Sequence, residues 1–113
     1  MKVFLVLAFF AGSLFAQTPG TVTVNSATNV TAVASSVNCV LHKKSSLVVT
    51  VTCKVLGVTM LTSTTTIGAN RNGTVGDYTN AGDSVTWLVN QPQGQTSLSW
   101  QMAANGTQKS GTF

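Results

Sequence analysis

The chain has 113 residues, of which 7% are charged, and its formal net charge is +4. Its six basic residues are spread along the chain, which excludes the dense basic tract expected of a nucleic-acid-binding protein. The length suits one domain with one modest core. We expect neither a metal nor an organic cofactor, because the sequence contains no motif for either.

The chain begins with MKVFLVLAFFAGSLFAQTPG, in which one lysine precedes an apolar run and small residues follow it. This order is typical of a secretory signal peptide, and cleavage after Ala16 would leave residues 17–113 as a single domain. The apolar run is too short to span a bilayer, and no longer run follows it. We therefore expect a secreted, extracellular protein with no transmembrane segment.

From Thr18 onward, Val and Thr alternate in short stretches such as TVTVN, LVVTVTCKV and SLSWQM, without a helical period of 3.6 residues. β-Branched residues in alternation favour half-buried strands. Turn-forming residues separate these stretches at Pro19-Gly20, 43–46, Gly57, 68–83, 91–95 and Asn105-Gly106. The pattern predicts an all-β fold, a small antiparallel β-sandwich of immunoglobulin-like type with about seven strands.

The stretch NCVLHKKSSLVVTVTC, residues 38–53, contains both cysteines and the only histidine. Because side chains alternate along a strand, Cys39 and Cys53 fall on the apolar faces of their strands, while His42 points away. A loop over residues 45–47 would place the two cysteines directly across neighbouring strands, and the alternative is a bridge between facing sheets. Either arrangement predicts one disulfide, which loop-closure entropy makes worth about 3 kcal/mol.

Two rival interpretations of this stretch are a pair of reduced cysteines and a metal site that includes His42. The metal site lacks a third ligand nearby in the sequence. The hairpin tip, His42-Lys43-Lys44, is either a solvated basic turn or a binding site for an acidic glycan or a lipid headgroup.

Three N-glycosylation sequons begin at Asn29, Asn72 and Asn105. In a secreted chain, each predicts a glycan on a surface asparagine. The last two are also Asn-Gly pairs, which favour two-residue hairpin turns with positive φ at both residues. A glycan and such a turn are compatible only if the asparagine side chain faces solvent.

Catalytic chemistry has few candidate groups in this chain. The two carboxylates, Asp77 and Asp83, lie in a segment rich in Gly and Asn, where short polar side chains form turns. A glycosidase-type pair would need one carboxyl in an apolar pocket, and the neighbouring residues do not supply one. The Gly-x-Ser-x-Gly turn that would accompany His42 in a hydrolase is also missing. We therefore expect no enzymatic activity and no catalytic residues.

A hairpin is predicted around QPQGQ, residues 91–95. A four-residue loop from Pro92 to Gln95 would place Trp87 directly across from Trp100, with Val89 facing Leu98 and Val85 facing Met102. The opposite face would be polar, with Leu88 as its one apolar member among Thr86, Asn90, Ser97, Ser99 and Gln101. Indoles flanked by aliphatic residues favour a core position. The alternative is an exposed sugar-binding platform that includes Tyr78, Trp87 and Trp100.

The stretches TVTVNSATNV and GDSVTWLVNQPQGQTSLSWQMAANGTQKSGTF resemble the first and last strands of small secreted fungal Ser/Thr-rich cell-wall proteins, whose N-terminal domain is an immunoglobulin-like sandwich. The resemblance covers less than half of the chain. It rests on a Thr-Trp pair, a Val-Asn strand end and a polar hairpin. It implies an extracellular sandwich at a cell wall and carries over no catalytic residues.

These observations support two main functional hypotheses. The first is a secreted, glycosylated, non-enzymatic structural or surface-interaction protein that acts at a cell wall or host surface. The second is a carbohydrate-binding module that uses exposed aromatics, and a small basic effector or inhibitor that binds a protein partner is a third. The expected partners are a cell-wall polysaccharide or a host surface protein.

Overall fold

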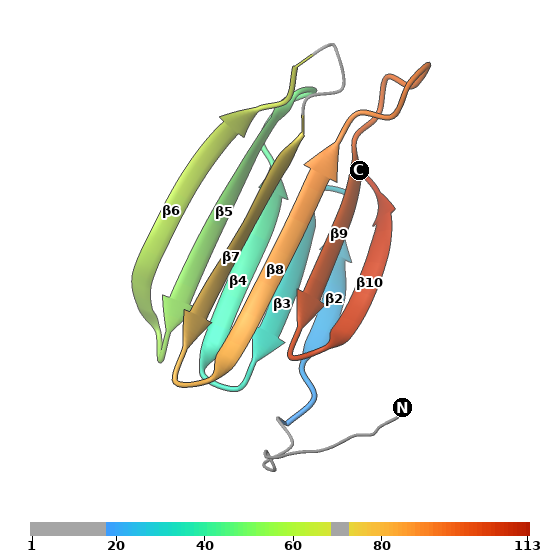
Figure 1. The fold of residues 1–113 in the computed structure, drawn as a ribbon. Coiled ribbons are helices and arrows are strands. Elements are labelled where there is room, and N and C mark those ends of the chain that lie inside the picture. The colour runs from blue at the N-terminus through green and yellow to red at the C-terminus, as the bar shows by residue number, and fades with distance from the viewer. Residues whose placement is uncertain (1–17, 69–72) are drawn as a thin grey trace.

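The computed structural model describes residues 18–68 and 73–113, which form nine strands in two antiparallel sheets (Figure 1). The five-stranded sheet has the order β2 (Thr21–Ser26), β3 (Asn29–Ala34), β4 (Val37–Lys43), β5 (Val48–Val55) and β6 (Val58–Thr66). The four-stranded sheet has the order β10 (Thr107–Thr112), β9 (Ser99–Ala104), β8 (Asp83–Asn90) and β7 (Thr74–Asn80). The predicted signal peptide, residues 1–16, and the predicted glycosylation site Asn72 lie outside the described residues.

The predicted all-β sandwich is confirmed, but its strand number and order differ from the expectation. Nine strands are present in the described part of the chain, where about seven were expected. Each sheet is a meander in which every strand pairs with its neighbour in sequence. An immunoglobulin domain instead has Greek-key connections between its two sheets. The sandwich architecture is therefore confirmed, and its strands are arranged as two meanders and not in Greek-key order.

One additional strand, β7, lies within residues 68–83, which the sequence pattern predicts to be a turn-rich break. Ala81 and Gly82 have φ angles of 52° and 87°, the pattern of a type I′ turn, which reverses the chain from β7 into β8. Gly76 lies directly across from Trp87, and a Cβ on Gly76 would come within 2.5 Å of the indole Cζ2. The glycine that suggests a break thus makes room for an aromatic ring within a strand.

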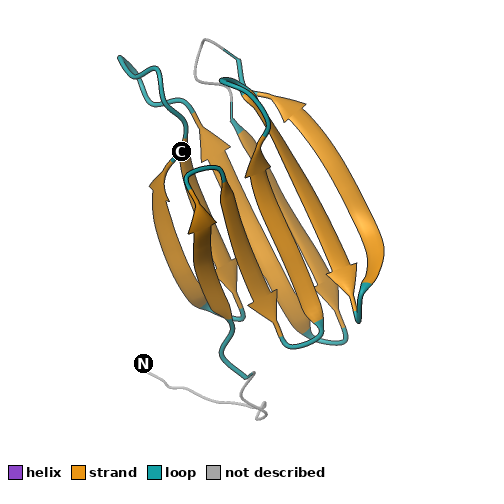
Figure 2. Ribbon diagram, turned by 180° about the vertical axis from the view of Figure 1, so that it is seen from behind, coloured by secondary structure: helices purple, strands orange, loops and turns teal. Residues whose placement is uncertain are grey.

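The two sheets stack face to face, and the loops gather at the two ends of the sandwich (Figure 2). β8 packs over β3 and β4, while β9 and β10 pack over β2. Inward-facing residues of β2 to β5, β8 and β9, together with Ile67 and Leu98 beside the strands, make the core. It contains Val22, Val30, Ala32, Ala34, Val37, Cys39, Leu41, Val49, Val51, Cys53, Ile67, Val85, Trp87, Val89, Leu98, Trp100, Met102 and Ala104. The described residues contain no helix, and so none that could cross a membrane.

The predicted disulfide and its register are confirmed. Cys39 and Cys53 are bonded to each other and lie directly across from one another on β4 and β5. The bridge therefore joins neighbouring strands of one sheet and does not cross the core between sheets. Because the two sulfurs are bonded to each other, the reduced-cysteine and metal-ligand interpretations are wrong, and both cysteines are fully buried.

The register predicted for the β8–β9 hairpin is wrong by two residues. Trp100 lies across from Val89, and Trp87 lies across from Met102, so the two indoles do not face each other. The connection between β8 and β9 is longer than expected, since it runs from residue 91 to residue 98. The predicted Pro92–Gln95 turn forms within this wider loop, and Leu98 is buried just before β9 begins. A shift of two residues preserves side-chain parity, so the predicted buried and exposed faces of both strands are still correct.

Candidate functional site

The outer face of the four-stranded sheet carries mostly uncharged side chains in rows that cross the strands, with Asp77 as the one carboxylate among them. Asn90 on β8, Ser99 on β9 and Thr112 on β10 form one row. The next row consists of Val75, Leu88, Gln101 and Ser110, and the third of Asp77, Thr86, Ala103 and Gln108. These side chains point away from the core because each is one position out of phase with the buried residues of its strand.

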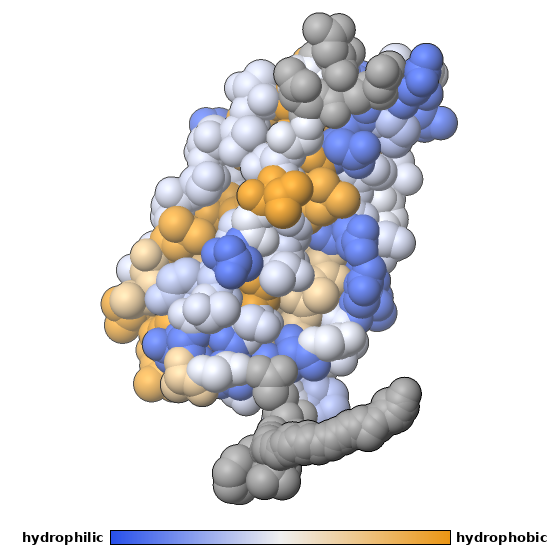
Figure 3. Space-filling model, viewed as in Figure 1, coloured by the Kyte–Doolittle hydropathy of each residue, from blue (hydrophilic) through white to orange (hydrophobic). Residues whose placement is uncertain are grey.

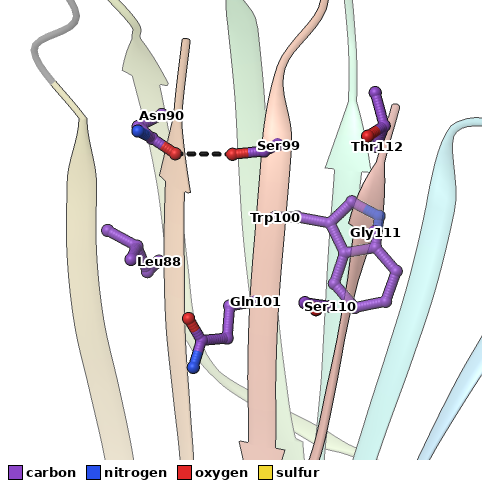
Figure 4. Close-up of a pocket in the computed structure, with 8 residues that line it drawn as sticks. All are labelled: Leu88, Asn90, Ser99, Trp100, Gln101, Ser110, Gly111 and Thr112. Atoms are coloured by element: carbon purple, nitrogen blue, oxygen red, sulfur yellow. Dashed lines mark hydrogen bonds between the residues drawn. The ribbon is translucent and has the colours of Figure 1, made fainter. Parts of the chain in front are cut away.

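Two shallow hollows indent this face. The larger, of about 370 Å³, is lined by Leu88, Asn90, Ser99, Trp100, Gln101, Ser110, Gly111 and Thr112 (Figure 4). The smaller, of about 210 Å³, is lined by Val75, Thr86, Trp87, Leu88, Gln101, Met102, Ala103 and Gln108. Leu88 and Gln101 line both hollows, and no lining residue of either is charged. We call this surface the β8–β10 outer face.

Hydrogen bonding fixes part of the larger hollow. The Ser99 hydroxyl donates to the Asn90 side-chain oxygen over 2.6 Å, and Figure 4 shows this bond at one end of the hollow. The bond leaves the Asn90 amide nitrogen with its two N–H groups as donors. Gln101 lies one row along the same two strands, beside Leu88. The hollow therefore presents hydrogen-bond donors and acceptors held at fixed positions by a paired sheet.

An apolar strip lies within this polar surface. Val75 on the edge strand β7 is 76% exposed and lies directly across from Leu88, which is 37% exposed. Figure 3 shows a hydrophobic patch over β7 and β8, surrounded by polar residues. A face of this kind suits a ligand that carries both hydroxyl groups and C–H surfaces.

The aromatic side chains named from the sequence do not form an exposed platform. Trp87 and Trp100 are 6% and 4% exposed, and Tyr78 is half-buried and packs against the core. Trp100 lies across from Gly111. A Cβ on Gly111 would come within 2.9 Å of the Trp100 indole. Both indoles therefore fill the space beside an edge-strand glycine. The predicted core position of the two indoles is confirmed, so they do not provide the exposed sugar-binding platform that was the alternative.

The basic hairpin tip lies at one end of the sandwich, away from the β8–β10 outer face. His42 is half-buried on the outer face of β4, where its Nδ1 lies 2.8 Å from the side-chain oxygen of Asn29. Lys43 is also half-buried, and Lys44 is exposed. The backbone N–H of Lys44 donates to the carbonyl of Val48 and closes the turn. These three residues belong to an ordinary hairpin end, and an anionic ligand there stays a prediction.

The sequon asparagine Asn105 does not face solvent. Its side-chain oxygen accepts from the backbone N–H of Ser84, and its amide nitrogen donates to the Thr18 carbonyl and to an Asp83 carboxylate oxygen, each at 2.9–3.0 Å. Asn105 is 9% exposed, and its φ of 47° with Gly106 at 87° forms the predicted type I′ turn. The predicted turn at Asn105-Gly106 is confirmed. The Asn105 side chain, however, does not face solvent as a glycan there would need. Asn29 is half-buried, and its glycosylation stays a prediction.

The two carboxylates do not form a pair. Asp77 shares the outer face with Thr86, whereas Asp83 has the parity of the buried residue Val85 and bonds to Asn105. Across residues 18–68 and 73–113, no three His, Cys, Asp or Glu side chains gather as metal ligands.

Sequence reasoning identified the polar face of the hairpin but not the site itself. Ser110 and Thr112 were missed, because only the β9–β10 pairing brings them beside Ser99 and Gln101. The one available signal was Leu88, the single apolar residue on an otherwise polar face.

Comparisons with known proteins identify no relative. No protein family, curated protein or solved structure matches this chain. The candidate site therefore rests on its own chemistry.

Proposed function

We propose that this is a secreted, non-enzymatic surface-interaction protein that binds a neutral polysaccharide at a cell wall or host surface through its β8–β10 outer face. One observation carries the proposal: two adjoining hollows are lined by amide, hydroxyl and aliphatic side chains and by no charged residue. An anionic or cationic ligand would find no countercharge there.

The lining chemistry matches the surface of a sugar chain. Each sugar hydroxyl both donates and accepts hydrogen bonds, and Asn, Gln, Ser and Thr side chains offer both capacities. Leu88 and Val75 provide apolar contacts for the C–H faces of pyranose rings. The hollows are shallow and open along the sheet, so an extended chain suits them better than an enclosed small molecule.

The distribution of reactive groups supports binding over turnover. The serines in the larger hollow, Ser99 and Ser110, lie on the four-stranded sheet, whereas His42 lies on the five-stranded sheet beside Asn29. A nucleophilic serine needs a base within hydrogen-bonding reach. The acid and base of a glycosidase must flank one bond, and Asp77 and Asp83 lie on opposite faces of their hairpin.

Two further features support an extracellular location. The first sixteen residues have the order of a signal peptide. The Cys39–Cys53 disulfide belongs to the kind of bond that persists in oxidising compartments and is rare in the cytosol.

The proposal is tested by retention on insoluble polysaccharides. Purified protein is mixed with chitin, β-glucan or mannan particles, and the bound fraction is measured after sedimentation. We expect retention on at least one of these neutral polymers, and loss of that retention in Gln101→Ala, because Gln101 lines both hollows.

The matched control is Asn38→Ala, which removes an exposed amide from the outer face of the other sheet. It should be retained like the wild type. Surface changes of this kind usually alter stability by no more than about 0.5 kcal/mol, so both variants should fold. Absence of retention on all three polymers, or equal retention of Gln101→Ala, would contradict the proposal.

A further inference from the structure

The two hollows of the β8–β10 outer face follow one another along β9, and the outward-facing side chains of this strand divide them. These side chains are Ser99, Gln101 and Ala103, which are short, long and short in turn. Ser99 lines the larger hollow, Ala103 lines the smaller one, and Gln101 lines both. Because a strand rises about 3.3 Å per residue, Ser99 and Ala103 are about 13 Å apart, which is longer than one pyranose ring. A ligand that fills both hollows therefore contains several sugar units in a row.

The smaller hollow combines aliphatic surface with polar groups. Ala103 lies directly across from Thr86 on β8 and from Gln108 on β10, so its short side chain leaves a depression between two longer ones. The exposed side chains of Val75 and Leu88, which pair with each other in the next row, add aliphatic surface to the same hollow. The side-chain amide of Gln108 can both donate and accept hydrogen bonds there.

The larger hollow is more polar. Leu88 is the one aliphatic side chain that lines it, and its polar lining residues are Asn90, Ser99, Gln101, Ser110 and Thr112 (Figure 4). Asp77, the one carboxylate of the outer face, lines neither hollow. The surface therefore suits an uncharged chain that turns hydroxyl groups toward the larger hollow and a group with both polar and apolar parts toward the smaller one.

We propose that the smaller hollow binds the acetamido group of an N-acetylated sugar, so that the β8–β10 outer face prefers a chain of N-acetylated sugars to a glucan. The inference rests on the proposed function, because it assigns a class of sugar to the same surface. The acetamido methyl group contacts the aliphatic side chains of Ala103 and Val75. The acetamido N–H and carbonyl bond to the side-chain amides of Gln101 and Gln108, which offer both donors and acceptors. A hydroxyl group in the same place has no methyl to cover the aliphatic surface.

The test compares the binding of chitotriose and cellotriose by isothermal titration calorimetry. These two trisaccharides have the same linkage and differ only at the second carbon of each ring, which carries an acetamido group in chitotriose and a hydroxyl group in cellotriose. The wild type should bind chitotriose about tenfold more tightly. This ratio is the lower end of the range for one apolar carbon in a hydrophobic pocket, because the smaller hollow is open to solvent.

Three variants locate the preference. Ala103→Gln should abolish it, because the longer side chain fills the smaller hollow. Val75→Thr should reduce it, because it replaces a methyl group by a hydroxyl group at a position that is 76% exposed, where folding should be unaffected. The matched control is Ser110→Gln, which places the same side chain as Ala103→Gln beside the larger hollow. It should weaken the binding of both trisaccharides alike and leave their ratio unchanged. Thermal melts show whether each variant is folded.

The other outcomes overturn the inference and separate it from the proposed function. Equal binding of the two trisaccharides by the wild type, or tighter binding of cellotriose, refutes the acetamido preference and leaves the proposed function standing. A preference that persists in both Ala103→Gln and Val75→Thr, or that disappears in Ser110→Gln, places the acetamido contact outside the smaller hollow. Binding of neither trisaccharide also refutes the preference, and retention on mannan or β-glucan particles then decides the proposed function independently.

Discussion

Replacing Trp100 by alanine is expected to destabilise the protein severely. The indole is 4% exposed, lies across from Val89 on β8 and from Gly111 on β10, and its ring centre is 6.3 Å from that of Phe113. The absence of a Cβ on Gly111 leaves a space that only this ring fills. The strand that carries Trp100, β9, is hydrogen-bonded on both sides, to β8 and to β10, which limits its collapse into the space that alanine would leave.

The expected loss is about 3–5 kcal/mol, the range found when a buried tryptophan or phenylalanine is truncated to alanine. Domains of this size have a total stability of about 5–15 kcal/mol, so the variant should be partly unfolded or close to it. At about 4 °C or more for each kcal/mol, the melting temperature should fall by at least about 12 °C.

Urea denaturation and thermal melts followed by circular dichroism measure this loss. Leu88→Ala is the control, because it truncates a large side chain that is already 37% exposed on the outer face of the same sheet. The control should lose much less stability than Trp100→Ala. A Trp100→Ala protein within about 1 kcal/mol of the wild type would refute the core assignment of this indole.

Two other substitutions test the packing described above. Gly76→Ala should lower the free energy of unfolding by about 1–3 kcal/mol in urea denaturation, because the new Cβ would meet the Trp87 indole at 2.5 Å. In a double-mutant cycle, this loss should shrink when Trp87 is replaced by Leu. An equal loss with Trp87 and with Leu at this position would contradict the contact. Asn105→Ala should lower the free energy of unfolding by about 1–3 kcal/mol, because it removes the shared partner of the Ser84 N–H, the Thr18 carbonyl and the Asp83 carboxylate. An unchanged denaturation midpoint would show that these hydrogen bonds are not important for stability.

The sequence predicted the faces of the strands more reliably than their pairing. Alternation places Cys39, Cys53, Trp87 and Trp100 on buried faces regardless of register, because a shift by two residues leaves every side chain on its own side. The β4–β5 register was one of the two arrangements that the sequence allowed for a Cys39–Cys53 disulfide, and the structure has that one. The β8–β9 hairpin has no such constraint, and its wider loop moved the pairing by two residues.

Features that depend on distant parts of the chain could not be predicted from local patterns. Asn105 reads as a surface sequon, yet the carbonyl of Thr18 and the carboxylate of Asp83 converge on its amide in the folded protein. The hollows of the β8–β10 outer face likewise need three strands side by side, and their outline depends on the twist of the sheet. The strand order was unpredictable for the same reason, since a meander and a Greek key present similar alternation in each strand.

The most direct test of the proposed function is a two-dimensional NMR titration of isotope-labelled protein with soluble chitin and β-glucan oligosaccharides. We expect concentration-dependent shifts at the backbone amides of β8, β9 and β10 and at the side-chain amides of Asn90 and Gln101, with the outer face of β3 to β5 unaffected. Shifts centred on His42 and Lys44, or no shifts with either class of oligosaccharide, would contradict the assignment of a neutral-sugar site to the β8–β10 outer face.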